Sequence, residues 1–434
     1  MVSGKESTRL FDDLLFPKIF RTFRIAIQPT KLIIAFLAVA VICLAGWVMD
    51  LSRTVVVGTY GPNKVAELGI YMNRLGDPCA ATQAHIDKYK DQDKGERAGV
   101  FSTLWHFGSA KFHAALGELF ELNFKSVGEN LRDCFRAVTW AFRYHCIYSL
   151  IFVTIALGLI SVAGGALCRI AALQFAQGEK PGLTEAIRFS VKRFTSFFTA
   201  PLAPIGIMLF MGLFIFLLGL AGNIPQVGEL IVVLGMPLAL INGALIAVIL
   251  IGAVVGFGLM FPAVAYDGSD CFDSISRSFS YVYAEPSRMA CYTVIAAVYG
   301  AICYVFVRFF AFLTLSITHC LLQLGIWTDS STKGVDKLTA IWPKPEFMNF
   351  LASSDPAPTT WAELLAARLV CLFVLMVVGL MVSFIISFYF SANTIIYSLM
   401  RNRVDNTALN DVCTHFDEAE IETSTAELQP GQEQ

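Results

Sequence analysis

The chain has 434 residues, of which 56% are hydrophobic and only 15% are charged, and its net charge is -2. Soluble domains average roughly 45–50% apolar and 25% charged residues, so this composition excludes an ordinary water-soluble protein and indicates an integral membrane protein. The small net charge gives no reason to expect a nucleic-acid partner. The eleven cysteines include no C-x-x-C pair, which disfavours a zinc site, and we expect no cofactor.

The N-terminal residues 1–31 are basic and precede the first apolar run. Residues 10–25 alternate apolar and basic positions around Pro17. This pattern is typical of an amphipathic segment in the lipid headgroup layer, although it fits an ordinary solvated terminus equally well. Residues 32–51 are predicted to form the first transmembrane anchor, because Leu32–Met49 carries no charge and no A-x-A cleavage site follows it.

Residues 52–143 are numerous enough for a helical domain outside the cytoplasm. Apolar side chains recur every three to five positions from residue 101 to residue 143, which predicts helices. Residues 58–97 are rich in glycine, proline and charge, and they indicate a solvated linker. Cys79 and Cys134 would form a disulfide in an oxidising compartment if their Cα atoms approached closely enough, which the sequence does not show.

Residues 144–403 are predicted to form a membrane core of five further spans, which makes six spans in all. The apolar runs cover residues 146–168, 197–221, 230–266, 289–318 and 369–400. The longest run could cross the membrane twice, but it lacks the polar turn that two crossings need, and one long or tilted helix is favoured. The predicted fold is an all-α integral membrane protein, a six-span helical bundle with an outward helical insertion.

Lysine and arginine gather in alternate connections between the spans, and these predict the orientation of the chain. They occur in residues 1–31, in residues 174–196, and as Arg277, Arg288, Arg401 and Arg403. The positive-inside rule places these segments and both termini in the cytoplasm. Residues 322–362 are then an irregular outward cap. Residues 404–434 are predicted to be a disordered cytoplasmic tail, because they are acidic and contain no lysine or arginine.

Two cytoplasmic connections share an order of parts, which suggests a parallel internal repeat. Each has a glycine-containing turn, a short amphipathic segment and the start of another span. At an offset of 88 residues the matched pairs are Glu185 and Asp273, Ile187 and Ile275, and Ser190 and Ser278. Amphipathic helices at these places would lie on the membrane surface. The predicted interface cations are Arg188, Lys192, Arg193 and Arg277.

The stretches FDSISRSFSYV and TIIYSLMRNRVD resemble a poorly characterised set of bacterial polytopic membrane proteins. This set includes the membrane domain attached to some glycerophosphodiester phosphodiesterases. The recurring positions are Asp273, Ser274, Ile275, Arg277, Ser278 and Phe279 in a helix after a span, and Tyr397 and Arg401 near the end. The resemblance covers about residues 150–400. It implies an architecture in a bacterial inner membrane more than an activity, and nothing here resembles a phosphodiesterase catalytic domain.

Arg308 and Asn242 are the polar side chains inside predicted spans that could carry a function. Arg308 would either face the bundle interior or extend to the headgroups, and Asn242 fits a helix–helix hydrogen bond better than a ligand contact. Catalytic signatures are absent from the sequence, so we expect no enzyme. We expect a structural or accessory subunit that organises membrane lipid or a protein complex, as a homo-oligomer or with a protein partner. The alternative is a transporter or channel with a path between the repeats near Arg308.

Overall fold

The computed structural model of this protein describes residues 16–60, 63–73, 77–90, 96–121, 123–327, 336–347, 350 and 360–413. The chain divides into two compact units. We call residues 38–159 the inserted unit, and residues 1–37 with 160–434 the core unit. The predicted outward domain falls within the inserted unit, which also contains parts of the first two spans.

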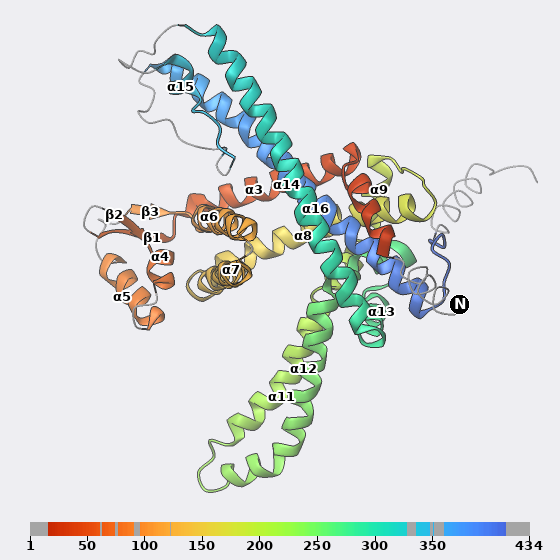
Figure 1. Ribbon diagram of the computed structural model, residues 1–434. Coiled ribbons are helices and arrows are strands. Elements are labelled where there is room, and N and C mark those ends of the chain that lie inside the picture. Colours follow the sequence, from red (N-terminus) through yellow and green to blue (C-terminus); the bar gives the residue numbers. More distant parts are fainter. Residues whose placement is uncertain are drawn as a thin grey trace, which may run out of the picture. The chain divides into compact units, whose positions relative to one another are not determined.

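Six helices are long and apolar enough to cross a membrane, which confirms the predicted number of spans (Figure 1). They are α3 (Pro29–Met49), α8 (Cys146–Ala176), α11 (Ala203–Ala221), α12 (Gly228–Asp267), α14 (Pro286–Gly325) and α16 (Trp361–Val404). Most other described elements are also helical, and the single sheet is small. The chain is therefore an all-α integral membrane protein.

The long apolar run forms one helix, as predicted. Helix α12 has 40 residues, which corresponds to about 60 Å, roughly twice the hydrocarbon thickness of a bilayer. Residues 259–266 at its C-terminal end are buried by neighbouring helices, whereas most large side chains between residues 230 and 257 are exposed. Protein thus covers the last turns of the helix, which account for part of its excess length. Gly268 ends the helix in the left-handed conformation, with φ of 61°.

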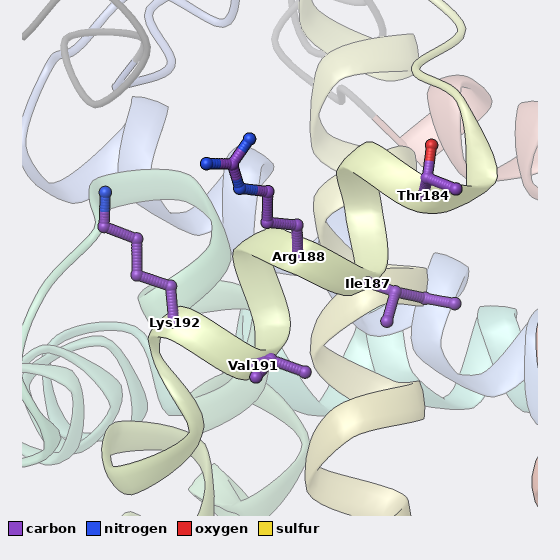
Figure 2. A pocket seen from close by; sticks show the side chains of 5 residues that line it. All are labelled: Thr184, Ile187, Arg188, Val191 and Lys192. Atoms are coloured by element: carbon purple, nitrogen blue, oxygen red, sulfur yellow. The ribbon is translucent and has the colours of Figure 1, made fainter. Parts of the chain in front are cut away.

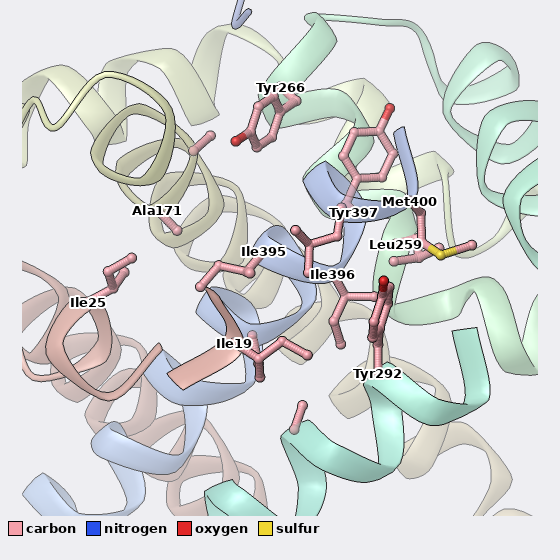
Figure 3. Packing of buried hydrophobic residues seen from close by; sticks show 14 of the residues in the cluster. Ile19, Ile25, Ala171, Leu259, Tyr266, Tyr292, Ile395, Ile396, Tyr397 and Met400 are labelled. Carbon is pink, nitrogen blue, oxygen red and sulfur yellow. The ribbon is translucent and has the colours of Figure 1, made fainter. Parts of the chain in front are cut away.

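The largest buried cluster of the core unit joins the ends of several spans, and we call it the hub (Figure 3). It contains the C-terminal parts of α8, α12 and α16 and the N-terminal part of α14. The N-terminal end of α3 joins it because the Lys31 amine donates a hydrogen bond to Ser391 of α16. Six spans that alternate in direction would have all these ends on one side of the membrane. The hub therefore agrees with the predicted alternation.

The N-terminal segment packs into the hub, where a headgroup location or a solvated terminus was expected. It comprises η1 (Phe16–Arg21) and α2 (Thr22–Ala26). Ile19 and Ile25 are buried, and Ser387 of α16 donates a hydrogen bond to the Ala26 carbonyl. The solvated terminus is the wrong interpretation for residues 16–26, because the apolar side of this segment faces protein, whereas its location in the headgroup layer stays a prediction. Residues 10–15 lie outside the described residues.

Two pairs of long helices extend beyond the hub within the core unit. Helices α11 and α12 form one pair, and α14 and α16 form the other. Few residues of α11 are buried, and side chains such as Leu209 and Phe216 are exposed. Along α14, buried residues recur at intervals that place them on one face, from Met289 to His319. The other faces of both pairs present apolar side chains to the surroundings.

The predicted outward cap packs against the second helix pair. Helix α14 runs on to Gly325, and the cap contains the short helix α15 (Lys337–Ile341). Leu338, Trp342 and Phe350 are buried and belong to one apolar cluster with residues of α14 and α16. Residues 328–335, 348–349 and 351–359 of this segment lie outside the described residues.

Two shorter helices follow α8 and α12 at equivalent positions. Helix α9 (Leu183–Lys192) and helix α13 (Cys271–Ala284) begin 88 residues apart, at the offset of the predicted repeat. Both bury small side chains at matching places, which are Ala186 and Ser190 in α9 and Ser274 and Ser278 in α13. A side chain added at Gly165 of α8 would collide with Ser190, and Ser274 donates a hydrogen bond to a carbonyl of α12. The close approach of each short helix to its preceding span supports the repeat.

The inserted unit contains a folded α/β subdomain where the sequence indicated a linker. Strands β1 (Val55–Tyr60), β2 (Asn63–Ala66) and β3 (Glu96–Ala98) form an antiparallel sheet of order β2-β1-β3. Helices α4 (Glu67–Met72) and α5 (Pro78–Lys90) accompany the sheet. The linker prediction for residues 58–97 is therefore wrong for the described residues, and the domain is not purely helical. Period-two alternation over such short strands was too weak to predict them.

The predicted helical stretch of the inserted unit is a pair of helices, α6 (Val100–Phe120) and α7 (Phe124–Tyr144). The amine of Lys111 on α6 lies 2.8 Å from the carboxylate of Asp133 on α7. The Asp50 carboxylate, from the short η2 (Asp50–Ser52) after α3, accepts hydrogen bonds from the backbone amides of Phe101 and Ser102. These amides lie at the start of α6 and lack partners within the helix, so Asp50 acts as its N-terminal cap.

Candidate functional site

A cluster of ionic and phenolic side chains lies around Asp267, at the C-terminal end of α12. The Asp267 carboxylate is 3.2 Å from Nε of Arg401 and 3.3 Å from Nη1 of Arg277. It also accepts a hydrogen bond from the Tyr397 hydroxyl. Arg277 makes a second ion pair of 3.0 Å with Asp273 of its own helix. One nearly buried carboxylate therefore joins helices α12, α13 and α16.

This arrangement connects the two motifs that the sequence singled out. Arg277 comes from the first motif, and Tyr397 and Arg401 come from the second. Asp267 was not among the predicted site residues, although it is the acidic residue that ends the longest charge-free run. A carboxylate at the end of a span, followed by arginines expected on the same side, is the signal that could have identified it.

The residues after α16 continue the cluster. Arg401 binds Asp411, with 3.1 Å between Nη2 and Oδ2, and the Tyr281 hydroxyl donates to Asp405. The Cys413 amide donates to the carbonyl of Tyr266. Residues 405–413 therefore pack on the hub, and the prediction of a disordered tail is wrong for this part. Residues 414–434 lie outside the described residues.

Arg169 of α8 attaches the same C-terminal segment to a further span. Its Nη1 donates hydrogen bonds of 3.1 Å to the Ala265 carbonyl and 3.0 Å to the Cys413 carbonyl. Its guanidinium carbon lies 4.6 Å from the centre of the Phe189 ring of α9. The Arg169 guanidinium therefore connects α8 to α12 and the C-terminal segment through hydrogen bonds, and to α9 through the ring contact.

The chemistry of the cluster is that of a structural joint. Its carboxylates face arginines or phenols of the same chain, which lowers the cost of burying their charge. Burial together with the neighbouring Asp405 carboxylate raises the pKa of Tyr281 above its ordinary value, so this phenol stays protonated and keeps its role as a donor. An arrangement of charged groups that satisfy one another favours a fixed geometry over a binding site for an external ion.

The four predicted interface cations fall into two groups. Arg188 and Lys192 are exposed on α9 and line a shallow groove with Thr184, Ile187 and Val191 (Figure 2). In Figure 2 the two cationic side chains extend to one side of the helix, and Ile187 and Val191 extend to another. Arg193 lies 3.8 Å from the carboxylate of Asp270, and Arg277 belongs to the Asp267 cluster. Only the first two have the exposed position expected of headgroup contacts.

The structure places Arg308 beneath the cap, where its side chain is enclosed by protein. Its Nε donates to the Phe347 carbonyl at 3.0 Å, and its Nη1 donates to the Tyr304 hydroxyl at 2.9 Å. The rings of Phe347 and Phe350 lie 5.4 and 5.1 Å from the guanidinium carbon. The residue is 2% exposed, so extension to the headgroups is the wrong interpretation and the interior position is the correct one.

Asn242 has the role that the sequence favoured. Its Nδ2 donates a hydrogen bond of 2.8 Å to the Met211 carbonyl, which links α12 to α11. Arg308 therefore contacts the cap, whereas Asn242 joins a different helix pair. The two residues do not share a pathway in the described structure.

Lys31 was counted among the cations of the N-terminal flank, but its side chain is buried in the hub. Its amine lies 3.1 Å from the Ser391 hydroxyl, and both residues are 0% exposed. A serine beside a lysine has the composition of a nucleophile and its base. Because both side chains are enclosed, a substrate could not reach them, and the pair connects α3 to α16 instead.

Cys79 and Cys134 both carry free thiols in this structure. Cys79 lies in the first turn of α5, and its carbonyl accepts a hydrogen bond from Tyr144. Cys134 lies on α7, where burial raises the pKa of its thiol and so disfavours the reactive thiolate. A disulfide between the two cysteines stays a prediction. The described residues contain no group of three or more His, Cys, Asp or Glu side chains arranged to hold a metal ion.

The fold and the site define a mainly helical integral membrane protein in which an ionic cluster joins the ends of several spans. Comparison with family models, with curated proteins and with solved structures gives no match for this chain.

Proposed function

We propose that this protein is a non-enzymatic, multi-pass protein of a bacterial inner membrane, and that it acts as a structural or accessory subunit. Both termini would be cytoplasmic, on the side of the hub. The observation that carries the proposal is a contrast between two parts of the protein. The groups of the ionic cluster around Asp267 bind one another, whereas the apolar faces of the two helix pairs are exposed. Such faces are typical of surfaces that contact lipid or another subunit.

The contacts of Arg308 and Asn242 support this proposal over a transporter or channel. Transport near Arg308 would require its guanidinium to line a hydrated path, but a backbone carbonyl, a phenol and two aromatic rings surround it. Asn242 uses its amide to join two helices. The side chains of Arg308 and Asn242 therefore both have partners in their own chain, as a supporting role predicts.

The proposed partners are membrane lipid and a protein, either a second copy or a different subunit. Helix α11 and the first part of α12 offer a candidate surface, with exposed side chains such as Leu209, Phe216, Leu234 and Leu238. The sequence resemblance to bacterial polytopic proteins supports the same architecture and membrane. It contributes no activity.

The proposal is tested with purified protein in liposomes and with native membranes. Solute and ion permeability of the proteoliposomes should equal that of empty liposomes, and Arg308→Leu should leave it unchanged. A photo-cross-linking amino acid at Leu238 should capture one discrete protein or lipid in native membranes. The permeability assay has its own control, Gly243→Ala, because a methyl group added at Gly243 meets no atom within 4 Å. Protein-dependent flux that Arg308→Leu abolishes, in a correctly inserted protein, would overturn the proposal.

A further inference from the structure

Helix α7 of the inserted unit carries an apolar stripe that its own unit does not cover. One face of α7 is buried and includes Ala137, Trp140 and Ala141. On a different face, four large apolar side chains recur at intervals of four, three and four residues, which places them in one line along the helix. They are Leu131, Phe135, Val138 and Phe142, with exposed fractions of 60%, 66%, 48% and 39%.

The connection to a span fixes where this stripe lies. Only His145 separates the end of α7 from the start of α8, which crosses the membrane. Figure 1 shows α7 almost end-on beside the beginning of α8, while α8 runs across the picture, so the two axes are steeply inclined. A helix that leaves the end of a span at a steep angle must run along the bilayer surface. Ile147 and Leu150, in the first turns of α8, continue the exposed apolar surface.

Buried contacts hold the joint between α7 and α8. Nε2 of His145 lies 3.2 Å from the carboxylate of Glu67, which is 1% exposed and also accepts the Val56 amide. The Trp140 ring packs edge-on against the His145 imidazole, with 5.1 Å between ring centres. The direction of α7 is therefore set by the core of the inserted unit, because a change of angle would break these contacts.

Cations flank the apolar stripe along one side. Lys125, Arg132 and Arg143 are exposed, and at 100° per residue they fall within about 20° of one another and roughly 100° from the middle of the stripe. A row of cations beside an apolar stripe is the charge pattern of a helix that lies in the plane of an anionic membrane. A second copy of the chain would present the same cations, so stacking two such faces would bring like charges together.

We propose that α7 is an in-plane membrane helix on the side of the bilayer where α8 begins. Leu131, Phe135, Val138 and Phe142 insert among the acyl chains of that leaflet. Lys125, Arg132 and Arg143 bind the phosphate groups of anionic lipids. The inserted unit thus rests on the membrane surface and is not suspended in the aqueous phase. This inference depends only on α8 crossing the membrane and is independent of the proposed function.

The test uses the full-length protein in nanodiscs of phosphatidylcholine, with and without phosphatidylglycerol. A benzophenone amino acid replaces Phe135 in one variant and Glu129 in a matched control, because both positions are exposed on α7 but lie on different sides of it. Illumination should give at least about tenfold more lipid adduct at position 135 than at position 129, since only the stripe reaches acyl chains. Adducts are identified by mass spectrometry.

A second comparison tests the cations. The combined substitutions Lys125→Gln, Arg132→Gln and Arg143→Gln should reduce the phosphatidylglycerol share of the adducts at position 135 to its bulk proportion. Equal lipid adduct at positions 135 and 129, or cross-linking of position 135 to a second copy without lipid adduct, would overturn the in-plane helix. Unchanged phosphatidylglycerol enrichment in the triple variant would overturn the role of the cations. The benzophenone replacements at positions 135 and 129 are both on exposed sides of α7 and leave its buried face intact, so folding is preserved in the compared proteins.

Discussion

The ionic cluster predicts that Asp267→Asn loosens the junction of α12 with α16, on which the C-terminal segment rests. The substitution keeps the shape of the side chain but removes the charge that faces Arg401, whose side chain is only 11% exposed. Removing one partner of a buried ion pair costs about 3–5 kcal/mol. Arg277, with 37% of its side chain exposed, adds little because water screens it. We expect a loss of about 3 kcal/mol, which corresponds to a roughly hundredfold change in the opening equilibrium.

Hydrogen exchange of the protein in nanodiscs measures this loss directly. The Cys413 amide, in the segment that follows α16, is bonded to the Tyr266 carbonyl of α12, so its exchange reports opening of the junction between these helices. In Asp267→Asn, peptides that contain residue 413 should exchange about a hundredfold faster than in the parent protein. Asp273→Asn is the matched control, because it removes a carboxylate from the same Arg277 at an exposed position. It should cost about 0.5–1 kcal/mol.

Two outcomes would refute this reasoning. Parent-like exchange in Asp267→Asn would mean that the cluster does not hold the junction of α12 and α16. Equal acceleration in Asp267→Asn and Asp273→Asn would mean that burial of the pair is irrelevant to its strength.

Two further predictions concern the inserted unit. Gly99→Ala should destabilise the unit by about 1–2 kcal/mol in thermal unfolding, because the new Cβ would lie 2.0 Å from the Asp50 carboxyl carbon and displace the cap of α6. Gly108→Ala should not destabilise the unit, because the space around Gly108 is open. Acidification should also destabilise the unit, because burial lowers the pKa of His85 below its usual 6.5 and the folded state favours the neutral ring. Stability is then complete above pH 6.5 and falls below it, by at most ~1.4 kcal/mol per pH unit, and His85→Gln should flatten the profile.

Different results would contradict each of these two predictions. Equal melting temperatures of the alanine variants at positions 99 and 108 would show that Asp50 is not a cap. An identical slope of stability against pH in the parent protein and in His85→Gln would assign the pH dependence to other groups.

The sequence predicted the spans well because their signal is local. The cost of placing a charge in the hydrocarbon core acts on each residue separately, so a charge-free run marks a span without knowledge of its neighbours. For this reason the single crossing of residues 230–266 and the hydrogen-bonding role of Asn242 could be predicted. The 88-residue offset between α9 and α13 was also visible in the sequence, because both segments follow an apolar run and a glycine-containing turn.

The sequence does not predict contacts that join distant parts of the chain. Residues 16–26 have the composition of a surface segment, but α14 and α16 cover their apolar side. The sequence left two positions open for Arg308, and its surroundings are decided by Phe347 and Phe350, which lie more than 35 residues further along the chain. The subdomain within residues 58–97 was missed because its strands are short and its apolar residues few.

By itself the sequence determined a six-span helical membrane protein and two motifs worth attention, because hydrophobicity and helical periodicity are properties of neighbouring residues. Only the tertiary structure decided that these motifs meet at Asp267, since Tyr397 is 130 positions away along the chain. The strength of such an ion pair depends on burial and on the approach of all its partners, and both are set by the packing of the helices.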